Sequence, residues 1–125
     1  MNNQALIIED DADLAIIFAE AIKAAGFETQ IIRDGKIALT QLLTSAPGIV
    51  VLDLHLPNVS GATILDKIRT DARLTQTLVI VTTADARLAD MLQTKADLVL
   101  VGQKIENSGN GACVFICFHR GSDIV

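Results

Sequence analysis

The stretch "IVVLDLHLPNVSG", Ile49 to Gly61, decides the fold and raises the question of function. Its first four residues are apolar, a run typical of a strand buried on both faces. A carboxylate, Asp53, follows at once, although burying an unpaired carboxylate costs several kcal/mol. Asp53 therefore lies either in a solvated turn just past the strand, or at the strand's carboxyl end, where an open α/β sheet presents its functional groups.

Strand and helix patterns alternate along the rest of the chain. Apolar residues spaced three and four apart predict helices between the strands, and the first of these helices ends at Gly26. The other strands are expected at Ala5–Ile8, Thr29–Ile32, Leu78–Val81 and Leu98–Val101. The helices are expected around Leu14–Ala25, Leu39–Leu43, Ile64–Ile68 and Leu88–Leu92. This alternation predicts an α/β fold with a doubly wound, five-stranded parallel sheet.

Composition limits the class of protein. The 125 residues suit one domain, and half of them are apolar while the only aromatic residues are four Phe, which indicates an aliphatic core. The net charge of −5 argues against direct binding to nucleic acid or to an acidic membrane surface. We find no signal peptide and no apolar run near ~20 residues, so we expect a soluble, cytoplasmic protein without a membrane partner. The two cysteines do not predict a disulfide framework.

Polar side chains follow several of the predicted strands. Glu9, Asp10 and Asp11 come directly after the first strand, Asp53 after the third and Thr83 after the fourth. Each has a local alternative, since Asp11 or Asp13 could cap the first helix and Thr83 the helix that follows it, and we interpret Asp11 as such a cap. Because the carboxyl ends of parallel strands meet at one edge of a sheet, their shared position favours a common site.

Carboxylates gathered at one edge repel one another. Two like charges about 4 Å apart repel by about 4 kcal/mol at an effective dielectric constant of about 20. Either one carboxyl stays protonated or a divalent cation lies between them, and hard oxygen ligands suit Mg²⁺. With Mg²⁺ present, a carboxylate can act as a nucleophile toward a phosphoryl group, and the Thr83 hydroxyl could hold a phosphoryl oxygen.

Three motifs, taken together, resemble the receiver domains of two-component response regulators. They are "LIIEDD" (6–11), "VVLDLHLPNVSG" (50–61) and "VIVTTA" (79–84), and the resemblance covers residues 4–101. It implies the flavodoxin-like receiver fold. It also implies that Asp53 is the phosphoacceptor and Thr83 the switch hydroxyl, with Thr82 as the last strand residue.

The same resemblance implies a Mg²⁺ site. Asp10 and Asp53 would bind the ion directly, Glu9 would act through metal-bound water, and His55 would contribute its backbone carbonyl. The His55 imidazole would influence the rate at which the phosphoryl group is hydrolysed. Gly61 is expected where the following helix and the strand backbone approach closely.

The resemblance ends near residue 101, so we divide the domain into a receiver core (1–101) and an atypical C-terminal segment (102–125). Receivers of this kind continue with Lys-Pro, whereas Gly102 and Gln103 occupy those positions here. Lys104 is the candidate substitute for the family lysine. We expect it not to reach the site, because two residues separate it from the strand end.

The C-terminal segment lacks a helical pattern, and "ACVFICF" (112–118) predicts a strand in place of the usual last helix. This strand either folds back onto its own sheet or exchanges with a neighbouring chain in a homodimer. We favour exchange, because an apolar strand with unpaired backbone groups promotes association. Cys113, Cys117 and His119 would be spread too widely along a strand to bind one metal ion, which favours a core-facing strand.

These observations predict a phosphoacceptor module without an output domain on this chain. A sensor histidine kinase or phosphotransfer protein would phosphorylate Asp53, and an unknown downstream protein would read the result. The protein would not be an enzyme beyond self-catalysed phosphotransfer and autodephosphorylation. The alternative is a degenerate receiver acting as a phosphorylation-independent interaction or scaffold module, because the family lysine is missing. A metal-dependent phosphatase is disfavoured, since His55 stands where its second aspartate would be.

Overall fold

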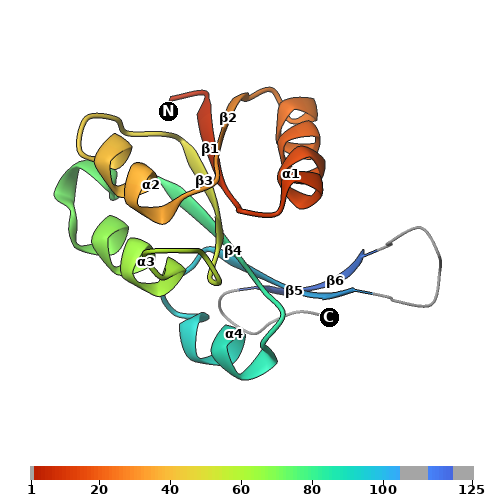
Figure 1. Cartoon of the computed structure of the whole chain (residues 1–125). Coiled ribbons are helices and arrows are strands. Elements are labelled where there is room, and N and C mark those ends of the chain that lie inside the picture. Colours follow the sequence, from red (N-terminus) through yellow and green to blue (C-terminus); the bar gives the residue numbers. More distant parts are fainter. Residues whose placement is uncertain (1, 105–112, 120–125) are drawn as a thin grey trace.

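The computed structural model describes residues 2–104 and 113–119, the latter range and residues 103–104 by their backbone alone (Figure 1). The strands are β1 (Gln4–Ile8), β2 (Glu28–Ile32), β3 (Ile49–Asp53), β4 (Leu78–Thr83), β5 (Leu98–Lys104) and β6 (Cys113–His119). The helices are α1 (Ala12–Ala24), α2 (Gly35–Leu42), α3 (Gly61–Thr70) and α4 (Ala86–Leu92), with a 3₁₀ turn η1 (Ala72–Leu74). The predicted alternation of strands and helices is confirmed.

The strands form one sheet in the order β2-β1-β3-β4-β5-β6. The first five are mutually parallel, which confirms the predicted doubly wound parallel sheet, and β6 is antiparallel to β5. The centre of the sheet is aliphatic and closed to water, as in Val50 and Leu52 of β3, neither of which has any exposed surface. This burial explains why the parallel strands are continuous apolar runs in the sequence.

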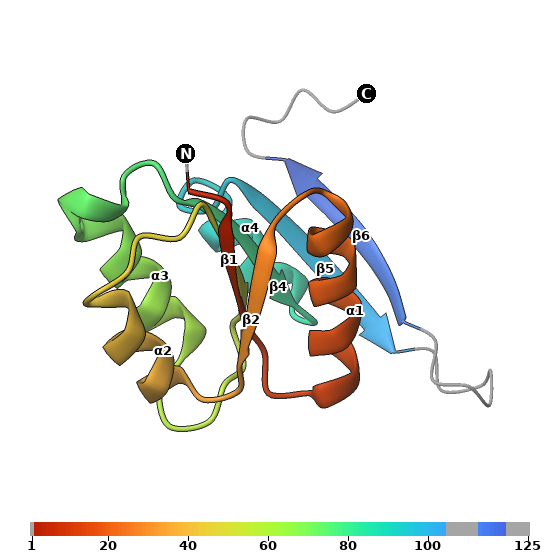
Figure 2. The ribbon, with the colours of Figure 1, turned by 90° about the horizontal axis from the view of Figure 1, so that it is seen from above.

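Helices cover both faces of the sheet, but unequally (Figure 2). A larger aliphatic core lies between the sheet and α2, α3 and α4. A smaller core around Phe18 lies under α1, which is the one helix described on that face. Among the described residues, no helix is long and apolar enough to cross a membrane.

Side chains at the strand-to-helix turns cap the helices. The Asp11 carboxylate accepts hydrogen bonds from the backbone N–H groups of Asp13 (3.0 Å) and Leu14 (3.1 Å), which confirms the predicted cap of α1. Asp34 and Ser60 cap α2 and α3 in the same way. The cap of α4 is Asp85, so the alternative that Thr83 caps this helix was wrong.

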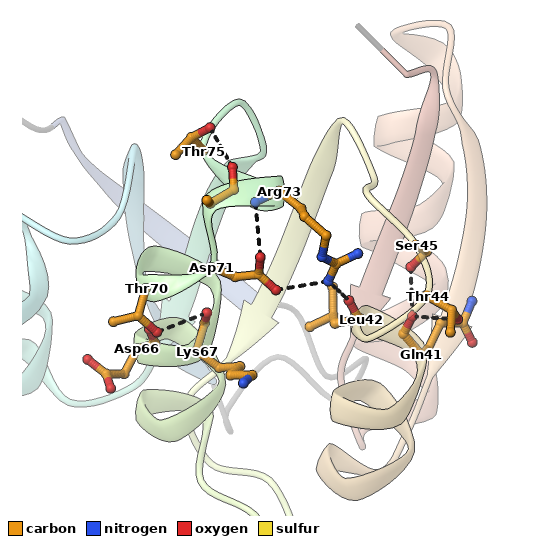
Figure 3. Close-up of polar contacts among 11 residues, drawn as sticks. Gln41, Leu42, Thr44, Ser45, Asp66, Lys67, Thr70, Asp71, Arg73 and Thr75 are labelled. Carbon is orange, nitrogen blue, oxygen red and sulfur yellow. Dashed lines mark hydrogen bonds and ion pairs between the residues drawn. The ribbon is translucent and has the colours of Figure 1, made fainter.

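Arginine side chains join the helices on the larger core to the rest of the domain. Figure 3 shows Arg73 of η1 between Asp71 and the end of α2, where it pairs with the Asp71 carboxylate (2.8 Å) and donates to the Leu42 carbonyl (2.8 Å). Arg69 of α3 donates to the Asp97 carboxylate (2.7 Å), which also accepts the Val79 N–H (2.8 Å). These contacts fix α3 against the amino-terminal ends of β4 and β5.

The C-terminal segment extends the sheet. β5 continues through Lys104 and so crosses the boundary expected after residue 101. β6 pairs along the whole of β5, from Leu98 opposite His119 to Lys104 opposite Cys113. The strand predicted from "ACVFICF" is thus confirmed, and within one chain it takes the fold-back alternative rather than the exchange that we favoured. A homodimer stays a prediction, and the side chains of Cys113, Cys117 and His119 lie outside the described part of the structure.

The close approach expected at Gly61 is present. The Gly61 N–H donates to the Leu54 carbonyl (3.1 Å), and α3 begins directly against the end of β3. A Cβ atom added to Gly61 would overlap the Asp53 carbonyl oxygen and the Leu54 Cα. Both are backbone atoms, one in the last residue of β3 and one in the residue after it, so they cannot move aside without disturbing the end of a central strand.

We expect Gly61→Ala to lower the free energy of unfolding by about 1–3 kcal/mol, because the methyl group forces α3 away from β3. Urea unfolding of the metal-free protein measures this. Lys67→Ala, at an exposed position of the same helix, is the matched control and should change stability by less than about 0.5 kcal/mol. Equal stability of the two variants would contradict the close-contact explanation.

Candidate functional site

Three carboxylates meet at the carboxyl edge of the sheet. β1 and β3 are neighbours with Ile8 opposite Leu52, so the residues that follow β1 lie beside Asp53. One oxygen from each of Glu9, Asp10 and Asp53 lies within 4.8 Å of the others, the single such group among the described residues. Glu9 is 2% exposed, Asp53 is half-buried and Asp10 is exposed. The predicted gathering of these side chains at one edge is therefore present.

The crowding of these groups changes the protonation of Glu9. Burial raises the pKa of Glu9 from 4.5 to about 9, and its hydrogen bond with Asp53 and the charge of Asp53 act in the same direction. Glu9 is therefore protonated at neutral pH in the metal-free protein. Carboxylate oxygens are the donors that hard divalent cations prefer, so the group fits such a cation once Glu9 loses its proton.

The backbone after β3 holds the Asp53 side chain. The His55 N–H donates to Asp53 Oδ1 (2.9 Å), and the Leu54 N–H donates to the Thr82 carbonyl (3.1 Å), which extends the ladder between β3 and β4. Asp53 is thus fixed at the last paired position of its strand. The metal-binding role expected of the His55 carbonyl stays a prediction.

Thr83 lies at the end of the next strand, on the other side of Asp53 from β1. β4 ends at Thr83 rather than at Thr82, one residue later than expected. The Thr83 side chain is buried, accepts the Asp85 N–H on Oγ1 (3.1 Å) and lies 3.4 Å from His55 Nε2. Spacing in the sequence gave no signal for the contact with His55, because it depends on the path of the loop after β3.

Arg33 is a residue of the site that our reading of the sequence missed. It directly follows β2, and its Nε and Nη2 donate to the Asp10 carbonyl oxygen at 3.2 and 2.9 Å. Just before it, the Ile32 carbonyl accepts the Glu9 N–H (3.0 Å). A basic residue immediately after a strand that neighbours β1 was the available signal.

The register of β5 against β4 indicates how far the Lys104 backbone lies from the carboxyl edge of β4. Val101 of β5 lies opposite Thr83, the last residue of β4. Lys104 follows three residues later in the same strand, so its backbone lies about 10 Å further along the strand direction. This register agrees with the expectation that Lys104 does not reach Asp53. Its side chain is outside the described part of the structure, and the expectation stays a prediction.

Comparison of the sequence with protein families matches residues 5–103 to the response regulator receiver domain. The DNA-binding response regulator MtrA of Mycobacterium tuberculosis (strain ATCC 25618 / H37Rv) is 36% identical over 72 residues, which are 58% of this chain and 32% of MtrA. The sensory transduction protein RegX3 of Mycolicibacterium smegmatis is 36% identical over 83 residues, 66% of this chain and 36% of RegX3. The chain thus spans about a third of the length of these curated relatives.

Solved structures show the same fold. A CheY-like receiver domain from Methylobacillus flagellatus superposes with a TM-score of 0.61 at 26% identity, covering 70% of this chain and 74% of that one. The response regulator TrrA of Thermotoga maritima, in complex with Mg²⁺-BeF, gives a TM-score of 0.69 at 24% identity, covering 86% and 90%. At 24% identity, the similarity to TrrA shows a shared fold and no more.

The raised pKa of Glu9 predicts how stability depends on pH. The folded metal-free protein holds the Glu9 proton up to about pH 9, whereas the unfolded chain releases it near pH 4.5. The stabilisation from neutral Glu9 is therefore complete below about pH 4.5 and is lost as the pH rises toward 9, by at most about 1.4 kcal/mol per pH unit.

Urea unfolding of the wild type and Glu9→Gln between about pH 5.5 and 8.5, with EDTA present, measures this effect. The stability of the wild type relative to Glu9→Gln should fall as the pH rises, because glutamine does not titrate. A difference that stays constant across this range would show that Glu9 is ionised in the folded protein.

Proposed function

Because the chain belongs to the family of response regulator receiver domains, we propose that it accepts a phosphoryl group on Asp53. The observation that carries this proposal is the approach of Glu9, Asp10 and Asp53 to within 4.8 Å at the carboxyl edge of the sheet. The Asp53 backbone is fixed because it pairs with Thr82 of β4. Asp53 is only half-buried, so its carboxylate remains accessible to a donor.

Asp53 acts as the nucleophile. A bond forms between a carboxylate oxygen of Asp53 and the phosphorus atom, the bond from phosphorus to the imidazole nitrogen of a donor phosphohistidine breaks, and the imidazole takes up a proton. The hydrogen bond from the His55 N–H holds the carboxylate in one orientation during the attack. The product is an acyl phosphate on the end of β3.

The carboxylates would hold Mg²⁺, together with the His55 carbonyl. Asp10 and Asp53 would be direct ligands and Glu9 would act through a bound water. When bound, the cation neutralises charge on the phosphoryl oxygens. Glu9 must release its proton on binding, since its raised pKa keeps it neutral in the metal-free protein. The complex of TrrA with Mg²⁺-BeF supports this assignment by analogy of fold.

Thr83 is the residue that would report phosphorylation. Its buried hydroxyl lies between the Asp85 N–H and the His55 imidazole, at the end of the strand next to Asp53. In the phosphorylated protein this hydroxyl would turn to donate to a phosphoryl oxygen. Such a turn breaks the contact with His55 and frees the Asp85 N–H at the start of α4, so the change reaches an exposed helix.

A sensor histidine kinase or phosphotransfer protein supplies the phosphoryl group in this proposal, and a downstream protein reads the phosphorylated state. The DNA-binding named for MtrA is a property of that protein, of which this chain matches about a third.

A second function is favoured by one observation, the glycine at position 102, where the family carries its lysine. Without that ammonium group, the phosphorylated state would have no lysine side chain to pair with the phosphoryl oxygens beside Mg²⁺. The chain would then act as an interaction or scaffold module independent of phosphorylation. Phosphorylation of the isolated protein separates the two functions.

We expect acetyl phosphate with Mg²⁺ to add one phosphoryl group to the wild type and none to Asp53→Asn, as measured by intact-protein mass. Asparagine keeps the size of the side chain but removes the nucleophilic oxygen. Asp90→Asn, at an exposed position of α4, is the matched control and should be labelled like the wild type. A folded wild type that stays unlabelled would favour the scaffold function.

We expect Mg²⁺ to raise the melting temperature of the wild type, because the ion binds the folded state alone. At about 100-fold excess over the Kd, this corresponds to about 2.7 kcal/mol. Asp10→Asn should remove most of the rise, whereas Asp13→Asn, which removes the same charge from the first turn of α1, should retain it. An unchanged Mg²⁺ response in Asp10→Asn would mean that the cation site lies elsewhere.

A further inference from the structure

Arg33 holds the main chain of the acidic loop, residues 9–11, although it is not one of the three residues whose carboxyl groups meet there. Both of its hydrogen bonds go to one acceptor, the Asp10 carbonyl oxygen, at 3.2 Å from Nε and 2.9 Å from Nη2. Two donors of one planar guanidinium converging on one oxygen fix the peptide that follows Asp10 in direction as well as position.

The pairing of β1 with β2 places Arg33 beside the acidic loop. The strand ladder brings β2 to the acidic loop, since Ile8 lies opposite Ile32 and the Ile32 carbonyl accepts the Glu9 N–H at 3.0 Å. Arg33 follows Ile32, and its side chain donates to the carbonyl of Asp10, which follows Glu9. The peptide groups on both sides of Glu9 and Asp10 are thereby tied to the end of β2.

Arg33 differs from the basic residues that form ion pairs in its partner, which is a main-chain carbonyl rather than a carboxylate. Among the residues that the structure describes, the ion pairs of arginine and lysine involve Lys23, Arg69, Arg73 and Lys95, and not Arg33. Its guanidinium instead donates two hydrogen bonds to a neutral carbonyl oxygen next to the three acidic side chains. A positive charge placed there opposes the binding of a cation, so its contribution must come from geometry.

We propose that Arg33 is a positioning residue that pre-organises the acidic pocket for a divalent cation by clamping the Asp10 carbonyl. The inference rests on the proposed function, because it concerns the same pocket. Without the clamp, the peptide that follows Asp10 keeps the long hydrogen bond from the Asp11 N–H to Glu9 Oε2 (3.4 Å) but loses the hold on its carbonyl, and binding the cation must order it further. With the clamp, the Asp10 carboxylate is already directed toward Glu9 and Asp53.

The clamp and the charge of Arg33 have opposite effects on the affinity for Mg²⁺, and substitutions can separate them. Arg33→Lys keeps the charge but loses the two-donor fork, whereas Arg33→Ala loses both. Lys36→Ala, a few residues further along at the same edge, removes one positive charge that makes no hydrogen bond to the acidic loop. It reports the effect of charge alone.

The experiment is a titration of each full-length variant with Mg²⁺, followed by calorimetry, with the metal-free melting temperature as the control for folding. We expect Arg33→Lys to raise the Kd about threefold to tenfold, the scale of one or two net hydrogen bonds. Arg33→Ala should bind no more tightly than the wild type, and Lys36→Ala should bind the same or slightly more tightly. The metal-free melting temperatures should agree within about 5 °C, since Arg33 is exposed and its hydrogen bonds contribute little to global stability.

The opposite pattern would overturn the clamp. If Arg33→Lys binds Mg²⁺ like the wild type and Arg33→Ala binds more tightly, Arg33 acts as a charge alone. If the wild type itself does not bind Mg²⁺, the proposed function fails together with this inference. Binding by the wild type with equal Kd values for the Arg33 variants leaves the proposed function intact and refutes only the role of Arg33.

Discussion

The mutual repulsion of Glu9, Asp10 and Asp53 is the constraint to which the rest of this edge of the domain responds. The parallel register of β1 and β3 makes the approach unavoidable, because residues that follow Ile8 must lie beside those that follow Leu52. Aliphatic packing of both strands prevents them from separating. The metal-free domain keeps a proton on Glu9, whose pKa rises to about 9 chiefly because the carboxyl is buried, while its hydrogen bond with Asp53 and the charge of Asp53 act in the same direction. In the proposed function, a bound cation would take the place of this proton.

Much of the fold follows from the sequence because its signals are local. Runs such as Ile49–Leu52 predict a strand buried on both faces, and the spacing of apolar residues predicted the helix α1. That spacing did not predict which side of α1 is buried, because Ala15, Phe18 and Ala19 are the buried residues while Ile17 is 56% exposed. Asp11 was identified as a cap because capping acts over two or three residues. The meeting of Glu9, Asp10 and Asp53 was also accessible, since parallel topology alone places strand ends together.

The contacts that could not be predicted depend on side-chain reach across elements. The Thr83–His55 contact joins the end of β4 to the loop after β3, and its length of 3.4 Å depends on the exact turn after β3. The position of Arg33 directly after β2 was a signal, but its partner was missed because that partner is a main-chain oxygen, which side-chain patterns do not mark. We predicted that β4 ends at Thr82, but its pairing with β5 extends it by one residue to Thr83. For β6 the strand was predictable, but an apolar strand carries no information on whether its partner lies in the same chain.

The caps of the helices have a consequence for the field around Asp53. In a parallel α/β sheet the helices begin at the edge where the strands end, so the positive ends of their dipoles gather there, each equivalent to about half an elementary charge. Carboxylates of Asp11, Asp34 and Asp85 offset this charge at α1, α2 and α4. α3 differs, because its cap is the neutral Ser60 and its first residue, Gly61, lies against the Asp53 backbone. Among the four α-helices described, the start without an anionic cap thus lies beside the end of β3, and the α3 dipole contributes there a partial positive charge that does not depend on pH.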